Sequence, residues 1–220
     1  MNIFIKYKKT QTNAYTLAET LISLLIIGVV ASITMKAIKD NIDNIKYANM
    51  AKAQYSRAAQ VVEQIRIENN LQDFRQKYGS FVSEFSKYFK TEKIYVNGRH
   101  DLLYNISYKT LNGKIAGMNL LDDGEMLVSD GSIWYFENPA NSSQLFISVD
   151  VNGYKKPNTF GKDLFMFYVD SNGFLMPMGS NDSPLPAKKY CVIHLDANDS
   201  AGRNQQGLGC MYYVLNNIKY

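Results

Sequence analysis

The sequence lacks the short motifs that mark common enzyme sites. It contains no glycine-rich phosphate loop, no His-Glu-x-x-His and no Gly-x-Ser-x-Gly. Its two histidines, His100 and His194, have no sequence context that groups them, and His100, set between two charged residues, is typical of a solvated loop. Catalytic groups can assemble from distant positions, so these absences disfavour an enzyme without excluding one. We therefore expect a structural or interaction protein.

Proline is absent from Tyr15 to Tyr88, so a helix in this stretch can stay continuous. Long apolar runs are also absent except for one, from Asn13 to Met35, which contains a single acid, Glu19. As a helix, Tyr15 to Met35 would rise about 30 Å, the thickness of a bilayer's hydrocarbon core. The sequence therefore predicts one membrane segment, residues 15–36, attached to an otherwise water-soluble chain.

Acidic residues are missing from the leader, residues 1–14, which holds Lys6, Lys8 and Lys9. The formal net charge of the chain is +4, and it falls to +1 when the leader is removed. The basic balance therefore gives no support for a nucleic-acid surface. Positive charges before an apolar run favour a cytoplasmic N-terminus, so we expect a single-pass inner or cytoplasmic membrane protein whose residues after Met35 are exported.

The start of the apolar run, Ala14-Tyr15-Thr16-Leu17 followed by Glu19, resembles the processing site of type IV prepilins and type II secretion pseudopilins. The resemblance implies cleavage by a prepilin peptidase between Ala14 and Tyr15 and N-methylation of Tyr15. Glu19 would then be the fifth mature residue, where the family keeps a glutamate that pairs with the N-terminal amine of a neighbouring subunit. An unpaired carboxylate in lipid is disfavoured by about 2.5 to 3.5 kcal/mol near the centre of a membrane helix and by less near its end, so such a pair has a physical reason. The chain departs from the pattern at Ala14, Tyr15 and Ala18, where Gly, Phe and a larger aliphatic residue are usual.

By this resemblance the chain is expected to be a structural subunit of a type IV pilus or a type II secretion pseudopilus. Its implied partners are other subunits, the prepilin peptidase, an inner-membrane assembly platform and membrane lipid. The alternative is a single-span membrane-anchored extracytoplasmic domain that binds a ligand or has an enzymatic activity and forms no filament. The run could also be a plain signal anchor or a signal peptide, but a signal peptide's apolar region is only about 7 to 15 residues long. A plain anchor gives no reason for Glu19.

An amphipathic helical pattern continues over residues 37–78, which we expect to form a spine helix packed on a sheet. A coiled coil is the alternative, but strict heptads are not sustained. A fragment starting near Asn44 should fold as a soluble monomer, because it keeps this helix and the sheet. Gly79 and Ser80 break the pattern, and a short second helix ending near Lys93 is predicted. The apolar stripe of the spine consists of Ile38, Ile42, Ile45, Ala48, Tyr55, Ala58, Val62 and Ile65.

Strand patterns dominate the remainder of the domain at 79–220. They predict an antiparallel sheet of about four or five strands, with a two-residue turn at Asp130-Gly131. Trp134 alternates with its neighbours and is expected in the sheet core or in a subunit contact. The predicted fold class is α+β, a pilin-like long N-terminal helix packed on a C-terminal antiparallel sheet. The strands expected in this sheet are 125–129, 132–136, 144–149, 164–169 and 174–176; a separate strand at 190–195 and further short runs at 104–108 and 114–118 are also expected.

Asp150, Asn152 and Asp163 lie in a loop that reads DVNGYKKPNTFGKD. Asp-x-Asn-Gly can begin a calcium loop, because alternate side chains reach inward while glycine permits a sharp turn. By the resemblance, some pseudopilins carry a structural calcium in this part of the chain. The full EF-hand spacing is absent, however, and Asx turns explain the same residues without a metal. We expect a turn, keep calcium as the alternative, and expect no other cofactor.

Cys191 and Cys210 are the only cysteines. In an oxidising exported compartment such a pair is expected to form one disulfide. The resemblance agrees, because many pilins close a C-terminal loop in this way. In the chain-entropy model, closing a loop of this length stabilises the fold by roughly 3 kcal/mol or slightly more. There is no Cys-x-x-Cys and only His194 lies nearby, so a zinc or redox site is disfavoured.

Overall fold

The computed structural model describes residues 16–69, 78–98, 102, 106–117, 119–138, 144–193 and 205–220. The chain divides into two compact units, Met1–Asp43 and Asn44–Tyr220. The second unit begins at Asn44, the residue near which the sequence predicts a separately folding fragment to start. Independent folding of that fragment remains a prediction.

The first helix, α1 (Leu17–Asn69), is continuous. Residues 70–77 lie outside the described part, so the predicted extension of the spine to residue 78 is not covered. Within the second unit, one face of α1 is buried, beginning at Tyr47. The predicted stripe began too early, since Ile38, Ile42 and Ile45 are 56–60% exposed. Periodicity shows which residues share a face, but not how far along the helix a partner covers it.

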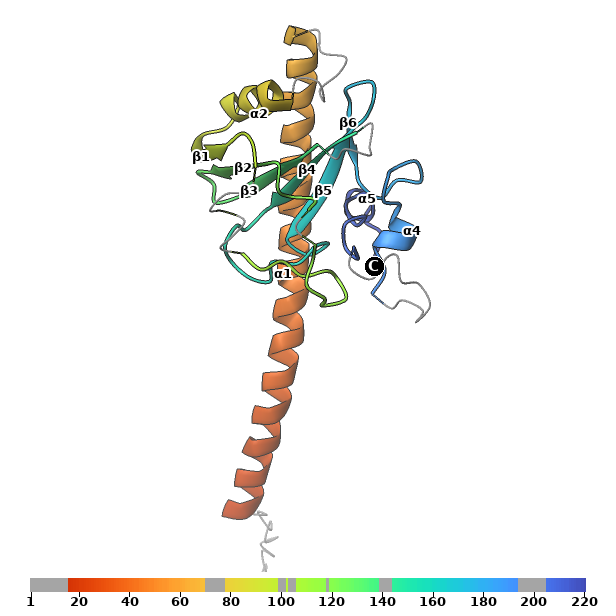
Figure 1. Ribbon diagram of the computed structural model, residues 1–220. Coiled ribbons are helices and arrows are strands. Elements are labelled where there is room, and N and C mark those ends of the chain that lie inside the picture. The colour runs from red at the N-terminus through yellow and green to blue at the C-terminus, as the bar shows by residue number, and fades with distance from the viewer. Residues whose placement is uncertain are drawn as a thin grey trace, which may run out of the picture. The chain divides into compact units, whose positions relative to one another are not determined.

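Six strands form one antiparallel sheet in the order β1-β2-β3-β4-β5-β6, so that each strand pairs with the next in sequence (Figure 1). The predicted antiparallel sheet is confirmed, with one strand more than expected. The strands are β1 (Thr91–Tyr95), β2 (Gly124–Val128), β3 (Ile133–Glu137), β4 (Leu145–Asp150), β5 (Leu164–Val169) and β6 (Leu175–Pro177).

The additional strand is β1, which replaces the end of the predicted second helix. That helix, α2, spans Tyr78–Lys87 and stops before Lys93. Phe89 nevertheless stacks on Phe85, with ring centroids 4.9 Å apart, so the aromatic pattern reflects a real cluster. β1 is held by its antiparallel ladder with β2, a tertiary pairing that its own short, mostly exposed sequence does not specify.

Both faces of the sheet are buried, each against different parts of the chain. Trp134 and Phe136 of β3 point to the face covered by α1 and α2, where they join one hydrophobic core. Ile133 and Tyr135, on the opposite face, join a second core with Tyr108 and other residues outside the helices. Trp134 is 0% exposed, which confirms the predicted core position. A strand buried on both faces loses the apolar and polar alternation of a half-exposed strand.

The β2–β3 hairpin is confirmed, but its turn is longer than predicted. The Gly131 N–H donates to Val128 O at 2.9 Å, and the Val128 N–H donates to Ser132 O at 3.0 Å. Three residues, 129–131, therefore form the loop, with Gly131 at φ +87°. In this type of three-residue hairpin, the turn is followed by a glycine that adopts the left-handed conformation.

The described residues of the C-terminal part form two short helices, α4 (Ala187–Tyr190) and α5 (Met211–Leu215). Between them, Cys191 and Cys210 form the predicted disulfide, with Cα atoms 4.9 Å apart. The predicted strand at 190–195 is wrong for its described residues, because Tyr190 ends α4 and residues 191–193 form no strand. The described residues of the runs at 104–108 and 114–118 form no strand, and of these Ile115 makes an isolated bridge with Lys109.

Candidate functional site

The part of α1 in the first unit presents an apolar surface. Its large apolar side chains, from Leu17 to Ile42, are between 51% and 77% exposed. Among the described residues, α1 is the one helix long and apolar enough to cross a membrane. An exposed apolar surface of this extent needs lipid or a protein partner.

Glu19 caps the N-terminus of this apolar helix. Its Oε2 accepts hydrogen bonds from the Thr16 N–H at 2.8 Å and the Thr16 hydroxyl at 2.9 Å, and the Glu19 N–H donates to Thr16 Oγ1 at 3.2 Å. The reciprocal pair is a capping box. The sequence reasoning sought an opposite charge and missed this local partner, although Thr-x-x-Glu is the pattern that would have revealed it. Ala14 and Tyr15 lie outside the described residues, so processing there remains a prediction.

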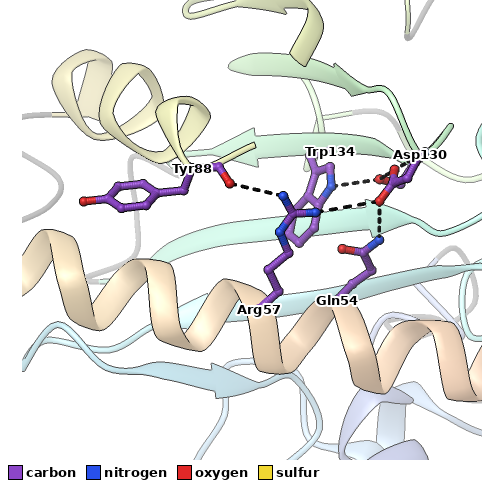
Figure 2. A network of polar contacts seen from close by, with 6 residues as sticks. Gln54, Arg57, Tyr88, Asp130 and Trp134 are labelled. Carbon is purple, nitrogen blue, oxygen red and sulfur yellow. Dashed lines mark hydrogen bonds and ion pairs between the residues drawn. The ribbon is translucent and has the colours of Figure 1, made fainter. Parts of the chain in front are cut away.

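A polar network, which we call the Asp130 clamp, joins α1 to the β2–β3 hairpin and to α2 (Figure 2). The Gln54 side chain donates to Asp130 Oδ2 at 3.0 Å, and Arg57 approaches the same oxygen at 3.9 Å. Arg57 also donates to the Tyr88 carbonyl at 3.1 Å, and its guanidinium lies 4.0 Å from the centre of the Phe89 ring.

On its other side, Asp130 holds the strand that carries Trp134. Asp130 Oδ1 accepts from the Ser132 N–H and hydroxyl at 2.9 and 2.6 Å, and the Trp134 indole donates to Ser132 Oγ at 3.1 Å. Partial burial acts to raise the pKa of Asp130, but hydrogen bonds from Ser132 and Gln54 and the charge of Arg57 together lower it. The clamp therefore keeps Asp130 ionised and fixes the hairpin tip to the helix, which is a structural task.

The predicted calcium loop is folded by its own hydrogen bonds. Asp150 Oδ1 accepts from the N–H groups of Asn152 and Gly153 at 3.1 and 2.9 Å, and Oδ2 accepts from the Tyr108 hydroxyl at 2.8 Å. Both oxygens of Asp163 accept backbone N–H groups, from Thr159 at 2.7 Å and Asn158 at 2.8 Å. Carboxylate oxygens that accept nearby backbone N–H groups are what the Asx turns expected from the sequence would produce. Calcium at these residues remains a prediction.

Asp150 and Asp163 are nevertheless an unusual pair, because both carboxyl groups are fully buried. Burial, and next the charge of Asp163, raise the pKa of Asp150 well above its ordinary value. Burial also raises the pKa of Asp163 against the effect of its N–H donors. Tyr108, which donates to Asp150, is itself 3.0 Å from the Tyr135 hydroxyl. The second core thus encloses a polar network.

A third group of acids, which the sequence reasoning did not identify, lies at the other end of the β2–β3 hairpin. We call Asp122, Asp123 and Glu137 the carboxylate cluster; one carboxylate oxygen from each lies within 4.8 Å of the others. Burial, and then the charges of Asp123 and Asp122, raise the pKa of Glu137 to about 8. The predicted hairpin could have revealed this cluster. One of its strands begins after Asp122-Asp123 and pairs with a strand that ends near Glu137, so the pairing places the three acids together.

In comparisons with protein-family models, with curated proteins and with solved structures, the chain matches none. Functional conclusions therefore depend on the residues and their geometry.

Proposed function

We propose that the chain is a structural subunit of a type IV pilus or a type II secretion pseudopilus, assembled through α1 after processing by a prepilin peptidase. The observation that carries the proposal is the exposed apolar part of α1, whose run up to Met35 contains a single acid, Glu19, in the first turn. A lone acid at that place, five positions after Ala14 and the basic leader, suits a helix that packs against copies of itself in a membrane and then in a filament.

The second unit supports the same proposal. One face of the helix packs on an antiparallel sheet, the layout of a subunit that offers its other helical surface to neighbours. The Cys191–Cys210 disulfide fits an oxidising compartment outside the cytoplasm, in agreement with a leader held inside by lysines. The proposed partners are other pilin or pseudopilin subunits, the peptidase, an inner-membrane assembly platform and membrane lipid.

The membrane-anchored domain without a filament is a second candidate, favoured by one observation. Glu19 already has a hydrogen-bonding partner in Thr16, so a neighbour's amine is not needed to satisfy its carboxylate at the helix start. In that case α1 would be an anchor, and the function would belong to the second unit.

The mature N-terminus separates the two candidates. Intact-mass and peptide mass spectrometry of the protein from its own host should find a chain that begins with N-methylated Tyr15. An Ala14→Leu variant should accumulate as precursor in the membrane, because the peptidase needs a small side chain there, whereas Ala18→Leu should be processed normally. Intact Met1, or a cut well beyond Ser32, would replace the filament proposal with the anchored domain.

A further inference from the structure

The carboxylate cluster is assembled by the register of the β2–β3 hairpin. Gly124 pairs with Phe136, so Asp123 precedes one member of the pair and Glu137 follows the other. The Asp123 backbone is tied to this hairpin end by its N–H, which donates to Phe136 O at 3.3 Å, and by its carbonyl, which accepts from the Gly98 N–H at 2.8 Å. The acids are thus held by paired backbone rather than gathered on a loose surface loop.

One oxygen of the carboxylate cluster is buried and unsatisfied. Glu137 is 6% exposed, and its Oε2 has no hydrogen-bond donor among the residues that the structure describes. No described lysine or arginine forms an ion pair with Asp123 or Glu137. Buried polar oxygens nearly always have a partner, and a buried carboxylate beside two other acids needs positive charge most of all. The Oε2 atom therefore points to a ligand that supplies such charge.

We propose that Asp122, Asp123 and Glu137 bind one calcium ion. Calcium takes six to eight oxygen ligands at about 2.3 to 2.6 Å, so ligand oxygens across the ion lie up to roughly 5 Å apart. One oxygen from each acid of the cluster lies within 4.8 Å of the other two, which fits that range as it stands. Magnesium, at about 2.0 to 2.1 Å with strict octahedral geometry, would draw the three acids closer together. Asp122 and Asp123 are partly exposed, which leaves the open side for water ligands.

The carboxylate cluster differs from the Asp150 loop in its carboxylate oxygens, although Asn152 Oδ1 of that loop is also buried without a described partner. All four carboxylate oxygens of Asp150 and Asp163 already accept hydrogen bonds from the chain, whereas Glu137 Oε2 accepts none from a described residue. A cation at the cluster would join the segment before β2 to the end of β3. This inference does not depend on filament assembly.

The test uses the full chain in detergent micelles, stripped of metal with chelator. Titration calorimetry with calcium chloride should find one ion per chain, with a dissociation constant in the range of about 10⁻⁴ to 10⁻³ M or tighter. Saturating calcium should raise the melting temperature followed by circular dichroism, since a ligand bound only by the folded state stabilises it. Magnesium at the same concentration should bind more weakly.

Variants locate the ion. Glu137→Gln and Asp123→Asn should each weaken calcium binding at least about tenfold and reduce the shift in melting temperature. Two controls should bind like the wild type: Asp182→Asn, which removes an exposed acid elsewhere, and Asn152→Ala, which alters the Asp150 loop. Glu137→Gln removes the buried acid and keeps the side-chain shape, so its melting temperature without calcium should not fall.

Three outcomes would overturn the assignment. The first is wild-type protein that shows neither binding heat nor a shift in melting temperature at about 5 mM calcium. That concentration exceeds the dissociation constants of the weakest extracellular calcium sites, so the cluster would then hold a proton instead of a cation. Binding that survives Glu137→Gln and Asp123→Asn places the ion elsewhere. Binding lost in Asn152→Ala but kept in Glu137→Gln moves it to the Asp150 loop.

Discussion

The parts of α1 before and after residue 44 differ in what covers them, although they belong to one helix. In the first part, Leu25 and Ile33 are 68% and 67% exposed; in the second, Ala58 and Ile65 are 0% exposed. Both parts are free of proline and contain good helix formers, so helix propensity does not separate them. The difference lies in the tertiary partner, which for the second part is the sheet and α2.

This contrast assigns two tasks to one element. The covered part stabilises the second unit, and the uncovered part is available for lipid or for other subunits. Substitutions in the first part should therefore affect insertion and assembly, while substitutions on the buried face of the second part should affect stability.

The largest effect is expected at Glu19, and two substitutions there separate its two roles. Glu19→Val should abolish entry into filaments when it is the sole copy, while processing and membrane insertion continue. Glu19→Gln keeps a side chain that can close a capping box but removes the charge, so it should fail in the same way if a neighbour's amine is the partner. Immunoblots of sheared filaments and of membranes measure both results.

Asp40→Asn is the matched control for Glu19, because it removes an acid from an exposed position on the same helix. It should assemble normally. Normal assembly of Glu19→Gln would show that the cap is sufficient, and normal assembly of Glu19→Val would remove the role of Glu19 altogether.

The next effect sharpens the comparison within the second part of α1, with two isoleucines two positions apart. Ile65 is 0% exposed and Ile67 is 65% exposed. Ile65→Ala should lower the free energy of unfolding by about 2 to 5 kcal/mol, because it leaves a cavity in the core. Ile67→Ala should change it by no more than about 0.5 kcal/mol. Urea unfolding of the fragment from Asn44, or of the full chain in detergent, gives both values.

Equal effects of the two substitutions would mean that α1 is not packed on the sheet through this face. Failure of the Asn44 fragment to fold would show that the second unit needs the first part of α1, against the division of the chain into two units.

Loss of the disulfide should have a somewhat smaller effect, concentrated at the C-terminal end. Cys191 and Cys210 are 19 positions apart, and a cross-link closing such a loop stabilises the folded state by roughly 3 kcal/mol in the chain-entropy model. Reductant, or the Cys191→Ser/Cys210→Ser double variant, should lower the melting temperature. Labelling of denatured protein should find no free thiol before reduction and two per chain afterwards; free thiols without reductant would contradict the pairing.

The smallest effect should appear as a dependence on pH, from Asp150. Its pKa is raised in the folded state, so the folded protein binds the proton more tightly than the unfolded chain does. The stability that this proton contributes is present at low pH and is lost as pH rises above the ordinary aspartate value. The free energy of unfolding should therefore fall less steeply with rising pH in Asp150→Asn than in the wild type. Asp182→Asn, an exposed control, should follow the wild type.

The sequence predicted the elements whose signals are local. The continuous helix followed from the absence of proline, and the hairpin at Asp130-Gly131 followed from turn residues between apolar runs. The disulfide followed from two cysteines in a chain expected to be exported. These features are set by residues close in sequence, or by having only one partner available.

The features that were missed depend on contacts between distant segments. β1 forms only because β2 offers a ladder to Thr91–Tyr95, and the second core exists because residues such as Leu102 and Tyr108 cover the far face of the sheet. To predict the carboxylate cluster, one needs the register of the β2–β3 hairpin. To predict that the buried face starts at Tyr47, one needs to know where the sheet begins to cover α1. Periodicity and propensity carry none of this information.

The order of the strands has a consequence for how the second unit can form. Each strand pairs with the one made just before it, so the sheet can extend strand by strand as the polypeptide emerges from a ribosome or a translocation channel. Apart from the long 96–123 connection between β1 and β2, this neighbour-to-neighbour pairing keeps paired residues close in sequence, which favours fast folding. Helix α5, which follows β6 and α4 in the sequence, supplies Met211 and Val214 to the core beside α1, and Cys210 completes the disulfide. The core therefore closes only once α5 has emerged, and a chain truncated before Cys210 would carry a finished sheet with an open core.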